Sequence, residues 1–483
     1  MALPYQRPSK ACRTFESPLV EEVISDLTSR MVDKDLARLF ENAFPNTLDT
    51  TVRWHVDGSE PKRKYSNGKW EGPQSFIVTG DINAEWLRDS TNQLAQYQPL
   101  TKADAALNNL ILGAINTQAE YIITSPYCNA FQPPAPSKLH PSHNGQGDTV
   151  HPAYEPAFVF ECKYELDSLA AFLSLTNQFH QHSGSTGFLT KRWFLALETI
   201  LAVLDEQSFG TFTADGAFRK NEYTFQRETN AGTETLALSG TGNPLASGTG
   251  LIRSAFRPSD DATILGFFIP ANAMISVELA RTADMLAATS GANKELIARL
   301  RRKSATIKAG IYEHGVVSHK SYGKVFAYEV DGYGSAIIMD DANLPSLLAL
   351  PLSGFVNTTD EIYQNTRRMI LSRQGNPYYL SGRAFKGIGG PHIGPQHAWP
   401  MSLLVAIMTT EDEEEIRENL ALVKKASQLG LMHESVHVDL VREYTRSWFA
   451  WANSVFAQMV LDLAQRKPEM LFGMGAKAYK VGG

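Results

Sequence analysis

Apolar residues recur at helical spacing along most of this chain. The first clear helix begins at Ser17-Pro18, an N-cap followed by proline at the first helical position. Its apolar positions are Leu19, Val23, Ile24, Leu27 and Met31, and the pattern continues to Pro45. The same spacing predicts further helices at 84–98, 103–124, 163–181, 189–206, 262–288, 293–314, 341–350, 360–373, 396–409, 412–428 and 447–466.

One region has a different pattern of residues. Residues 51–56, 68–72 and 75–81 are short, β-prone segments separated by turn residues such as Asn67-Gly68, which predicts a small β-hairpin region. Elsewhere we expect few strands. Helices do not alternate with strands, so a parallel sheet is disfavoured. An all-α fold is predicted, and about a dozen helices of similar length fit either a compact toroid or a helical array.

Two long segments, 125–160 and 207–256, are rich in proline, glycine or small polar residues. Loops of this length inside a compact domain are usually functional or disordered. Helical segments of similar character continue on both sides of each, so neither reads as a linker. We therefore expect residues 1–483 to form one domain, with an N-terminal helical extension.

The composition and net charge limit the classes of molecule that the chain is expected to bind. The net charge is −6 and the pI about 6.1, which leaves no basic excess for a nucleic acid. The apolar runs are too short to cross a bilayer, and the N-terminus lacks the apolar stretch of a signal peptide. Cys12, Cys128 and Cys162 allow at most one internal disulfide, and Asn357 begins a glycosylation sequon. The compartment stays open: secretory or extracellular if the chain is N-terminally trimmed, otherwise cytoplasmic.

Residues 79–93 combine aromatic, basic and acidic side chains at a loop-to-helix transition. The simplest interpretation of the acids is a helix start, where carboxylates favour the positive end of the dipole. However, Trp86, Arg88 and Asp89 together supply a ring for stacking, a guanidinium fork and a carboxylate. A polyhydroxyl ligand is bound by such groups. We therefore assign these residues to a candidate binding site.

Two adjacent carboxylates, Asp260 and Asp261, precede an apolar helix and follow Arg257. Either one alone is most simply an N-cap. A carboxyl group beside a like charge and an apolar wall has a raised pKa, as a general acid requires. The pair is therefore a candidate source of catalytic acid.

Two further stretches carry candidate ligand contacts. Residues 387–403 form a glycine-rich loop with His392 and Trp399, without the Lys-Ser/Thr ending of a phosphate loop. Residues 443–456 place Arg446 just before an aromatic-rich helix, in which we assign Phe449 to the core. We expect His392, Trp399 and Arg446 to contact a ligand.

The stretch His433-Glu434-Ser435-Val436-His437 has the H-E-x-x-H spacing of a zinc peptidase. That motif needs both histidines on one helical face and a third ligand. Valines at 436, 438 and 441 favour extended backbone instead. The metal interpretation is the weaker one, and it leaves Glu434 free to act as a catalytic carboxylate, with His433 as a sugar contact.

Five motifs resemble, in order, those of glycoside hydrolase family 125, the exo-α-1,6-mannosidases. They are "TGDINAEWLRDS", "ECKYELDSL", "FRPSDDA", "GIGGPHIGPQHAWPMSL" and "LMHESVHVDLVREYTRSWFAWANS". The resemblance runs from about Phe44 to Phe456, and the N-terminal segment is similar to the fungal branch, relatives of a meiotically up-regulated protein. The sequence departs from the bacterial pattern at Cys162, where a basic residue is expected, and at Ser447, where proline is expected.

The resemblance implies an (α/α)6 toroid with long active-site loops and hydrolysis of terminal α-1,6-linked mannose with inversion. It implies that Asp261 is the general acid, with Asp260 as the alternative, and that Glu434 is the general base. A pocket for the terminal mannose would be lined by Trp86, Arg88, Asp89, Arg257, His392, Trp399, His433 and Arg446. No metal or cofactor is implied, and the expected partner is a mannose-containing oligosaccharide bound by a monomer.

Two alternatives stay open at this point. A zinc peptidase would use His433, Glu434 and His437, and would lose activity with a chelator. A non-catalytic mannan-binding protein would bind without releasing mannose, although both carboxylates that catalysis needs are present in the sequence.

Overall fold

The computed structural model describes residues 2–59, 69–289, 291 and 293–481. The chain is mostly helical, as predicted. The longer helices are α1 (Pro18–Arg30), α2 (Lys34–Ala43), α4 (Leu87–Ala95), α5 (Ala105–Thr124), α6 (Leu166–Ser183), α7 (Lys191–Glu206), α9 (Ile269–Ala287), α10 (Lys294–His314), α12 (Glu361–Ile370), α13 (Pro400–Met408), α14 (Glu413–Ala426) and α15 (Ala450–Arg466). Shorter turns of helix are α3 (Asn46–Thr50), α8 (Ala237–Gly240), α11 (Leu350–Ser353), α16 (Glu469–Phe472) and the 3-10 helices η1 (Lys10–Cys12), η3 (Gln98–Leu100) and η4 (Ala135–Ser137).

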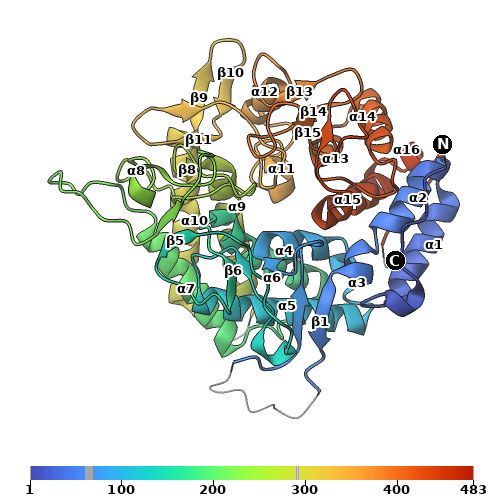
Figure 1. Ribbon diagram of the computed structural model, residues 1–483, viewed down its shortest axis with the longest axis horizontal. Coiled ribbons are helices and arrows are strands. Elements are labelled where there is room, and N and C mark those ends of the chain that lie inside the picture. The colour runs from blue at the N-terminus through green and yellow to red at the C-terminus, as the bar shows by residue number, and fades with distance from the viewer. Residues whose placement is uncertain (1, 60–68, 290, 292, 482–483) are drawn as a thin grey trace.

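The helices form an inner and an outer set. Helices α6, α9, α13 and α15 are buried on most of their positions, as helices surrounded by protein must be. Contacts run from α13 to α15, from α15 to α4, from α4 to α6 and from α6 to α9. Figure 1 shows these helices around the centre of the molecule, with α5, α7, α10, α12 and α14 farther out. The outer helices α10, α12 and α14 bury one face only.

Helix starts follow the predicted capping chemistry. The Ser17 side chain accepts a hydrogen bond from the backbone N–H of Val20, and Pro18 occupies the first helical position. The first helix does not continue to Pro45, however. Its last residue is Arg30, and α2 restarts behind Asp33, whose carboxylate accepts from the N–H groups of the next turn.

Two predicted helices differ from the structure for one physical reason. Residues 262–268 are not helical, because the N–H groups of Ile264 and Leu265 donate to the buried carboxylate of Glu329. Helix α9 therefore begins only at Ile269. Similarly, 341–349 is not helical, because Asp340 accepts from the N–H groups at 347 and 348. Side-chain acceptors compete with the helix for backbone donors.

Short antiparallel strands lie between the helices, and they are more numerous than predicted. The expected hairpin is confirmed as β1 (Val52–Val56) paired with β2 (Gln74–Ile77), while Asn67-Gly68 falls outside the described residues. The others are β3 (Glu85–Trp86), β4 (Ala130–Phe131), β5 (Asp148–His151), β6 (Val159–Glu161), β7 (Thr224–Arg227), β8 (Phe267–Phe268), β9 (Val316–His319), β10 (Gly323–Phe326), β11 (Glu329–Val330), β12 (Ala336–Ile337), β13 (Tyr379–Ser381), β14 (Lys386–Ile388), β15 (His397–Ala398) and β16 (Val436–His437). The pairing of β5 with β7 joins the two long predicted loops to each other.

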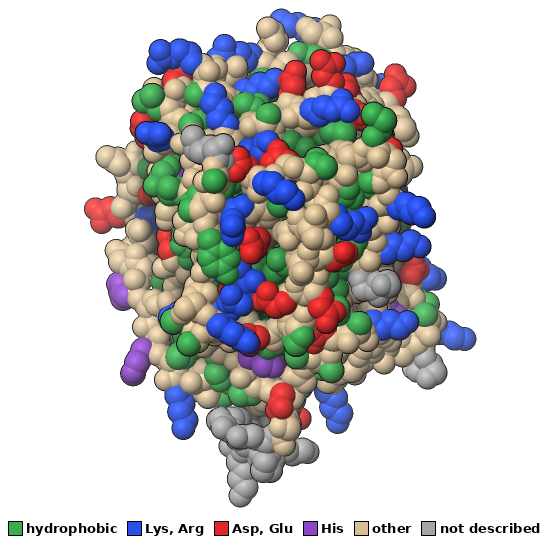
Figure 2. All heavy atoms as spheres, turned by 90° about the vertical axis from the view of Figure 1, so that its right-hand side faces the viewer, with side chains coloured by type: hydrophobic (Ala, Val, Ile, Leu, Met, Phe, Trp, Pro, Cys, Tyr) green, Lys and Arg blue, Asp and Glu red, His purple; other side chains and the backbone are tan. Residues whose placement is uncertain are grey.

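One hydrophobic cluster extends through the whole described chain, from Leu3 to Leu471. Both ends of the chain lie on the side of the molecule where α1 and α2 pack beside α15 and α16 (Figure 1). The guanidinium of Arg30 stacks there on Phe472, 4.4 Å from its ring centroid. On this face acidic and basic side chains are interspersed (Figure 2). Among the described residues, no helix combines the length and apolarity needed to cross a membrane.

Candidate active site

A pocket of about 480 Å³ opens where the N-terminal ends of inner helices meet the loops that precede them. Its wall contains most of the residues predicted from the sequence motifs. The lining residues are Thr79, Asp81, Ile82, Trp86, Arg88, Asp89, Pro258, Ser259, Asp260, Asn343, His392, Trp399, Glu434, Arg446, Phe449 and Trp451. Two carboxylates from distant parts of the chain, Asp260 and Glu434, therefore face one cavity.

Glu434 lies on the non-helical segment before β16 and is held by one cation. Arg446 Nε donates to Glu434 Oε1 at 3.1 Å, and the same guanidinium pairs with Asp81. The contacts neutralise the Glu434 carboxylate and fix its orientation. Both carboxylate partners of Arg446 line the pocket.

Asp260 sits in an unusual backbone conformation. Its φ is +66°, in the left-handed region that non-glycine residues rarely adopt. Its Oδ1 accepts hydrogen bonds from Asn129 Nδ2 at 2.9 Å and from Trp86 Nε1 at 3.3 Å. A residue strained in this way at a pocket wall is typical of functional sites. The turn aims the Asp260 carboxylate into the pocket.

A second carboxyl group lies directly behind Asp260. Glu165 is almost fully buried, and burial raises its pKa well above the ordinary value, with the charge of Asp260 acting in the same direction. Burial also acts to raise the pKa of Asp260, but the charges of Lys163 and Arg88 outweigh it and lower that pKa. Two carboxyl groups this close share a single proton. The opposed pKa shifts favour the protonated form of Glu165 and the ionised form of Asp260.

Arg88 forms the floor of the pocket. It is 3% exposed, and its Nη1 lies 2.6 Å from Glu165 and 3.4 Å from Asp167, while its Nη2 lies 3.1 Å from Asp89. Burial raises the pKa of Asp89 and of Asp167 to about 6, against the opposing pull of Arg88. The guanidinium also stacks on Trp451, 5.1 Å from the ring centroid. Arg88 is thus the one shared partner of three buried acids.

Asp261 does not line the pocket, although it was the expected general acid. It is 2% exposed and lies behind the wall, where Ser259 Oγ donates to its Oδ2 at 3.1 Å. Its Oδ1 lies 3.4 Å from His392 Nδ1. Burial lowers the pKa of His392, but the hydrogen bond and charge of Asp261 outweigh this and raise it to about 9. The geometry favours the alternative acid, Asp260, and gives Asp261 the role of holding a His392 cation at the pocket mouth.

Two predicted binding residues point elsewhere. Arg257 is buried in a salt bridge with Glu329, Nε to Oε1 at 2.6 Å, and does not line the pocket. His433 is also absent from the wall: its ring stacks on Tyr444 at 4.0 Å, and its Nδ1 lies 2.7 Å from the carbonyl oxygen of Arg446. Both residues support the wall from behind, so their predicted direct contact with a ligand is not seen.

The H-E-x-x-H stretch does not form a helix. Residues 431–435 are bends and coil, and Val436–His437 is strand β16. The His433 ring is held by Tyr444, whereas His437 accepts from the N–H of Asp439 and meets His397 edge-on. Among the described residues, no group of three or more His, Cys, Asp or Glu side chains is arranged to hold a metal ion. The geometry that the zinc peptidase alternative requires is missing from this segment.

Several residues that line the pocket or lie directly behind its wall were missed by the sequence interpretation. Phe449, assigned to the core, lines the pocket and packs on Trp399 and Trp451. Glu165 lies in a quoted motif, "ECKYELDSL", but nothing in that motif showed that it would reach Asp260. Asn129 comes from a long loop with no recognisable signal. Such residues are brought to the site only by the packing of α4 against α6 and α15.

Comparisons with known proteins point to one family. Residues 33–461 match the family described as metal-independent alpha-mannosidase, GH125. The chain is 54% identical over 474 residues to the meiotically up-regulated gene 157 protein of Schizosaccharomyces pombe, covering 98% of this chain and 90% of that protein.

Two solved structures extend the comparison. A metal-independent α-mannosidase of Streptococcus pneumoniae, in a non-productive complex with α-1,6-mannobiose, gives a TM-score of 0.82 at 34% identity, covering 93% of this chain and 99% of that one. A bacterial glucoamylase complexed with acarbose gives a TM-score of 0.50 at 11% identity, covering 94% of this chain and 57% of that one, a likeness of fold alone.

Proposed function

The chain belongs to glycoside hydrolase family 125, the metal-independent α-mannosidases, and on this premise we propose that it is an exo-acting α-1,6-mannosidase that works with inversion. The single observation that carries the proposal is that Asp260 and Glu434 line the same pocket. The pneumococcal structure with α-1,6-mannobiose supports the choice of linkage. The substrate class is a mannose-containing oligosaccharide.

The shape of the pocket supports exo action. Arg88 lines the pocket and also lines a second cavity, of about 1020 Å³, that lies on its other side. The Arg88 guanidinium and the carboxylates bound to it therefore form a floor between the two spaces. A pocket closed at its floor admits a chain end and excludes the middle of a glycan. One terminal mannose would enter, with the aromatic rings of Trp399, Phe449 and Trp451 beside it.

The proposed chemistry uses the two carboxyl groups differently. In the reactive arrangement the shared proton lies on Asp260, and Glu165 is ionised against Arg88. Asp260 gives that proton to the glycosidic oxygen as the bond to the anomeric carbon breaks. Glu434 takes a proton from a water molecule, whose oxygen attacks the anomeric carbon from the opposite face and forms β-mannose. For inversion we expect the two carboxyl groups to be about 6.5–9.5 Å apart, which leaves room for the water.

We also assign the architecture. The contacts of α4, α6, α9, α13 and α15 with their neighbours, and the outer helices that cover them, support an (α/α)6 toroid. The continuous core supports one catalytic domain over residues 1–483, with α1 and α2 as its N-terminal extension.

Two features support an oxidising, secretory-type compartment. The Cys128–Cys162 disulfide is closed in this structure, and structural disulfides persist mainly in such compartments. The sequon residue Asn357 is exposed and so accessible to glycosylation. Treating protein purified from its native source with an N-glycosidase tests this: a mass loss supports the assignment, and an unmodified Asn357 peptide contradicts it.

The central experiment is a panel of mannobioses of each linkage, with the anomer of the released mannose followed by NMR. We expect release from the α-1,6 isomer, with β-mannose appearing first. Release of α-mannose first would overturn inversion, and a preference for another linkage would overturn the specificity.

A matched pair of variants tests the base. Glu434→Gln should reduce kcat by about 10²–10⁴-fold, the range for loss of a general base, with unchanged folding. Glu443→Gln, an exposed carboxylate nearby in the chain, should leave kcat unchanged. A Glu434→Gln enzyme of near-normal rate would show that another group activates the water.

A further inference from the structure

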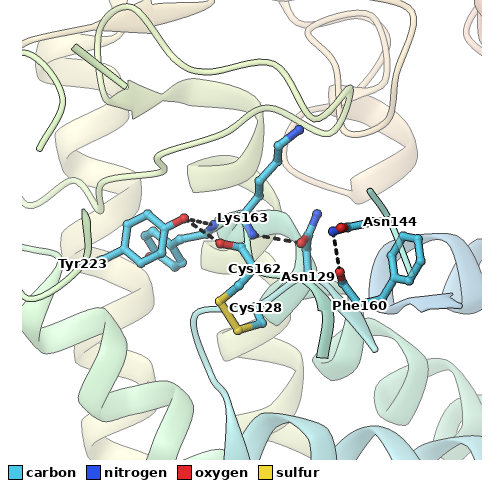
Figure 3. Close-up of a disulfide and its surroundings, with 8 residues drawn as sticks. Cys128, Asn129, Asn144, Phe160, Cys162, Lys163 and Tyr223 are labelled. Carbon is cyan, nitrogen blue, oxygen red and sulfur yellow. Dashed lines mark hydrogen bonds between the residues drawn. A yellow bond between two sulfur atoms is a disulfide. The ribbon is translucent and has the colours of Figure 1, made fainter. Parts of the chain in front are cut away.

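The Cys128–Cys162 disulfide lies one residue away from Asn129, which donates a hydrogen bond to the proposed general acid. It joins the loop after α5 to the segment after β6, across a sequence separation of 34 residues, and both cysteines are buried. Each cysteine is followed by a residue that acts on Asp260: Asn129 follows Cys128, and Lys163 follows Cys162. Figure 3 shows the disulfide with Asn129 and Lys163 extending from its two ends.

Asn129 has no freedom to rotate its amide. Its Oδ1 accepts from the backbone N–H of Lys163 at 3.0 Å, so its Nδ2 must face the other way. There Nδ2 donates to Asp260 at 2.9 Å and to Glu165 at 3.1 Å. The amide thus bridges both members of the proton-sharing pair. Its alignment depends on the distance between the chain at 129 and the chain at 163, which is the distance that the disulfide fixes.

Lys163 is 4% exposed, and its Nζ lies 3.5 Å from Glu161 and 5.3 Å from the centroid of the Phe256 ring. Hydrogen bonds hold the backbone at the residues before and after Lys163. The hydroxyl of Tyr223 donates to the carbonyl of Cys162 at 2.9 Å and accepts from the N–H of Tyr164 at 3.0 Å (Figure 3). Lys163 is thus a buried cation held in a fixed place, and its charge lowers the pKa of Asp260.

We propose that Asn129 and Lys163 are positioning residues for Asp260, and that the Cys128–Cys162 disulfide holds them in register with it. The inference rests on the proposed function, in which Asp260 donates the proton. Without the disulfide, the segments at 129 and 163 lose their covalent link and are held by the short pairing of β4 with β6 and by Tyr223. Their spacing then becomes looser, the N–H of Lys163 no longer orients the amide precisely, and the acid loses its alignment. A misplacement of about 1 Å in a catalytic group can reduce the rate about 10²-fold.

The first test distinguishes a loss of alignment of the general acid from a loss of activity on every substrate. The double variant Cys128→Ala/Cys162→Ala is assayed on α-1,6-mannobiose and on α-mannosyl fluoride, whose fluoride leaves without a proton from the enzyme. We expect kcat on mannobiose to fall by about 10–100-fold and kcat on the fluoride to change by less than about threefold. The matched control is Cys12→Ala, which removes an exposed free cysteine and should change neither rate.

Equal losses on the two substrates would overturn the proposal, because the disulfide would then be purely structural. Unchanged rates on both would overturn it as well. Should the double variant fail to fold, Asn129→Leu with the disulfide intact is the same test: it removes both hydrogen bonds to the acid pair, and the same split between substrates is expected. If wild-type enzyme releases no mannose from α-1,6-mannobiose, the proposed function itself has failed, and this is seen before any variant is made.

The second test uses the pH profile. The Lys163 cation favours the ionised form of Asp260, so Lys163→Met should move the alkaline limb of kcat on mannobiose to higher pH. Lys163→Arg keeps the charge and should keep the limb in place. A limb that does not move in Lys163→Met would overturn the role of Lys163, since a merely structural lysine would lower the rate without changing its pH dependence.

Discussion

Arg88 provides the sharpest test of how the site is stabilised. The perturbation is Arg88→Leu, which removes the guanidinium but keeps an apolar body against Trp451. It leaves Asp89, Glu165 and Asp167 buried, none of them more than 4% exposed, without the cation that all three share. A buried carboxylate that loses its cation is left uncompensated in a medium of low dielectric constant.

The magnitude follows from that burial. Removing one partner of a buried ion pair typically reduces stability by about 3–5 kcal/mol. Unfolding entropy near 60 °C is about 2.1 cal/mol/K per residue, which for this 483-residue chain is about 1 kcal/mol/K. The expected fall in Tm at pH 8 is therefore about 3–5 °C.

The loss should depend on pH with a defined sign. The folded-state pKa values of Asp89 and Asp167, about 6, lie above the ordinary value of 3.8. A carboxyl group with a raised pKa binds more protons in the folded state, so its contribution to stability increases as pH falls through the folded value. Without Arg88 both pKa values rise further. The gap between wild type and variant should therefore be widest near pH 8 and narrow towards pH 5.

Differential scanning calorimetry at pH 5 and pH 8 measures both effects. Arg417→Leu is the matched control, because Arg417 is 63% exposed and pairs with Glu413 on the surface of α14, where such pairs contribute less than about 0.5 kcal/mol. A fall in Tm of less than about 1 °C for Arg88→Leu would refute the reasoning. So would a gap of equal size at the two pH values.

Three further predictions follow from the site. Asp260→Asn should reduce kcat on α-1,6-mannobiose by about 10²–10⁴-fold but change kcat on α-mannosyl fluoride little. Asp261→Asn should show no such difference between the two substrates. The opposite pattern in steady-state kinetics would identify Asp261 as the general acid. An NMR titration of His392 should give a midpoint near pH 9, and this midpoint should fall towards 6.5 in Asp261→Asn. The stability that the His392–Asp261 pair contributes is then complete below about pH 6.5 and is lost as pH rises through 9. An unchanged midpoint in the variant would contradict the pairing. Cys128→Ala/Cys162→Ala should reduce the free energy of unfolding in urea by about 4 kcal/mol, from loop entropy over 34 residues; a loss below about 1 kcal/mol would contradict that account.

Much of the fold could be predicted because local chemistry determines it. The predicted helix at 103–124 is α5, Ala105–Thr124, and the segment at 293–314 is α10, Lys294–His314. In both, an Asp or Asn side chain caps the first turn, and an apolar stripe runs along the helix. These are short-range features, which a sequence displays directly.

The failures occurred where a distant side chain determined the backbone. Helix α9 begins late because Glu329, more than sixty residues away, binds the N–H groups at 264 and 265. The two arginines beside acidic motifs, Arg88 and Arg257, looked equivalent in the sequence. Only the fold distinguishes them, since Arg257 forms a buried salt bridge with Glu329, whereas Arg88 lines the pocket. Long-range partners of this kind leave no local pattern to interpret.

The choice between Asp260 and Asp261 has the same origin. The backbone makes a left-handed turn at Asp260. The Asp260 carboxylate therefore faces the pocket, whereas the Asp261 carboxylate contacts Ser259 and His392. The two differ because of their neighbours and not their chemistry. Asp260 lies beside Glu165, a buried carboxyl group whose pKa is raised, and Asp261 lies beside His392, whose pKa is also raised.

In the proposed mechanism, the same contrast determines which side of the pocket supplies the acid and which supplies the base. Asp260 lies against Glu165, whose pKa is raised, and this pair would provide the proton for the leaving oxygen. Glu434 lies against the Arg446 guanidinium, which balances the charge of a carboxylate that must accept a proton from water. One wall supplies an acid and the other a base because a carboxyl group is the neighbour on one side and an arginine on the other. Exchanging those neighbours while keeping both catalytic carboxylates is therefore expected to disable the reaction as well.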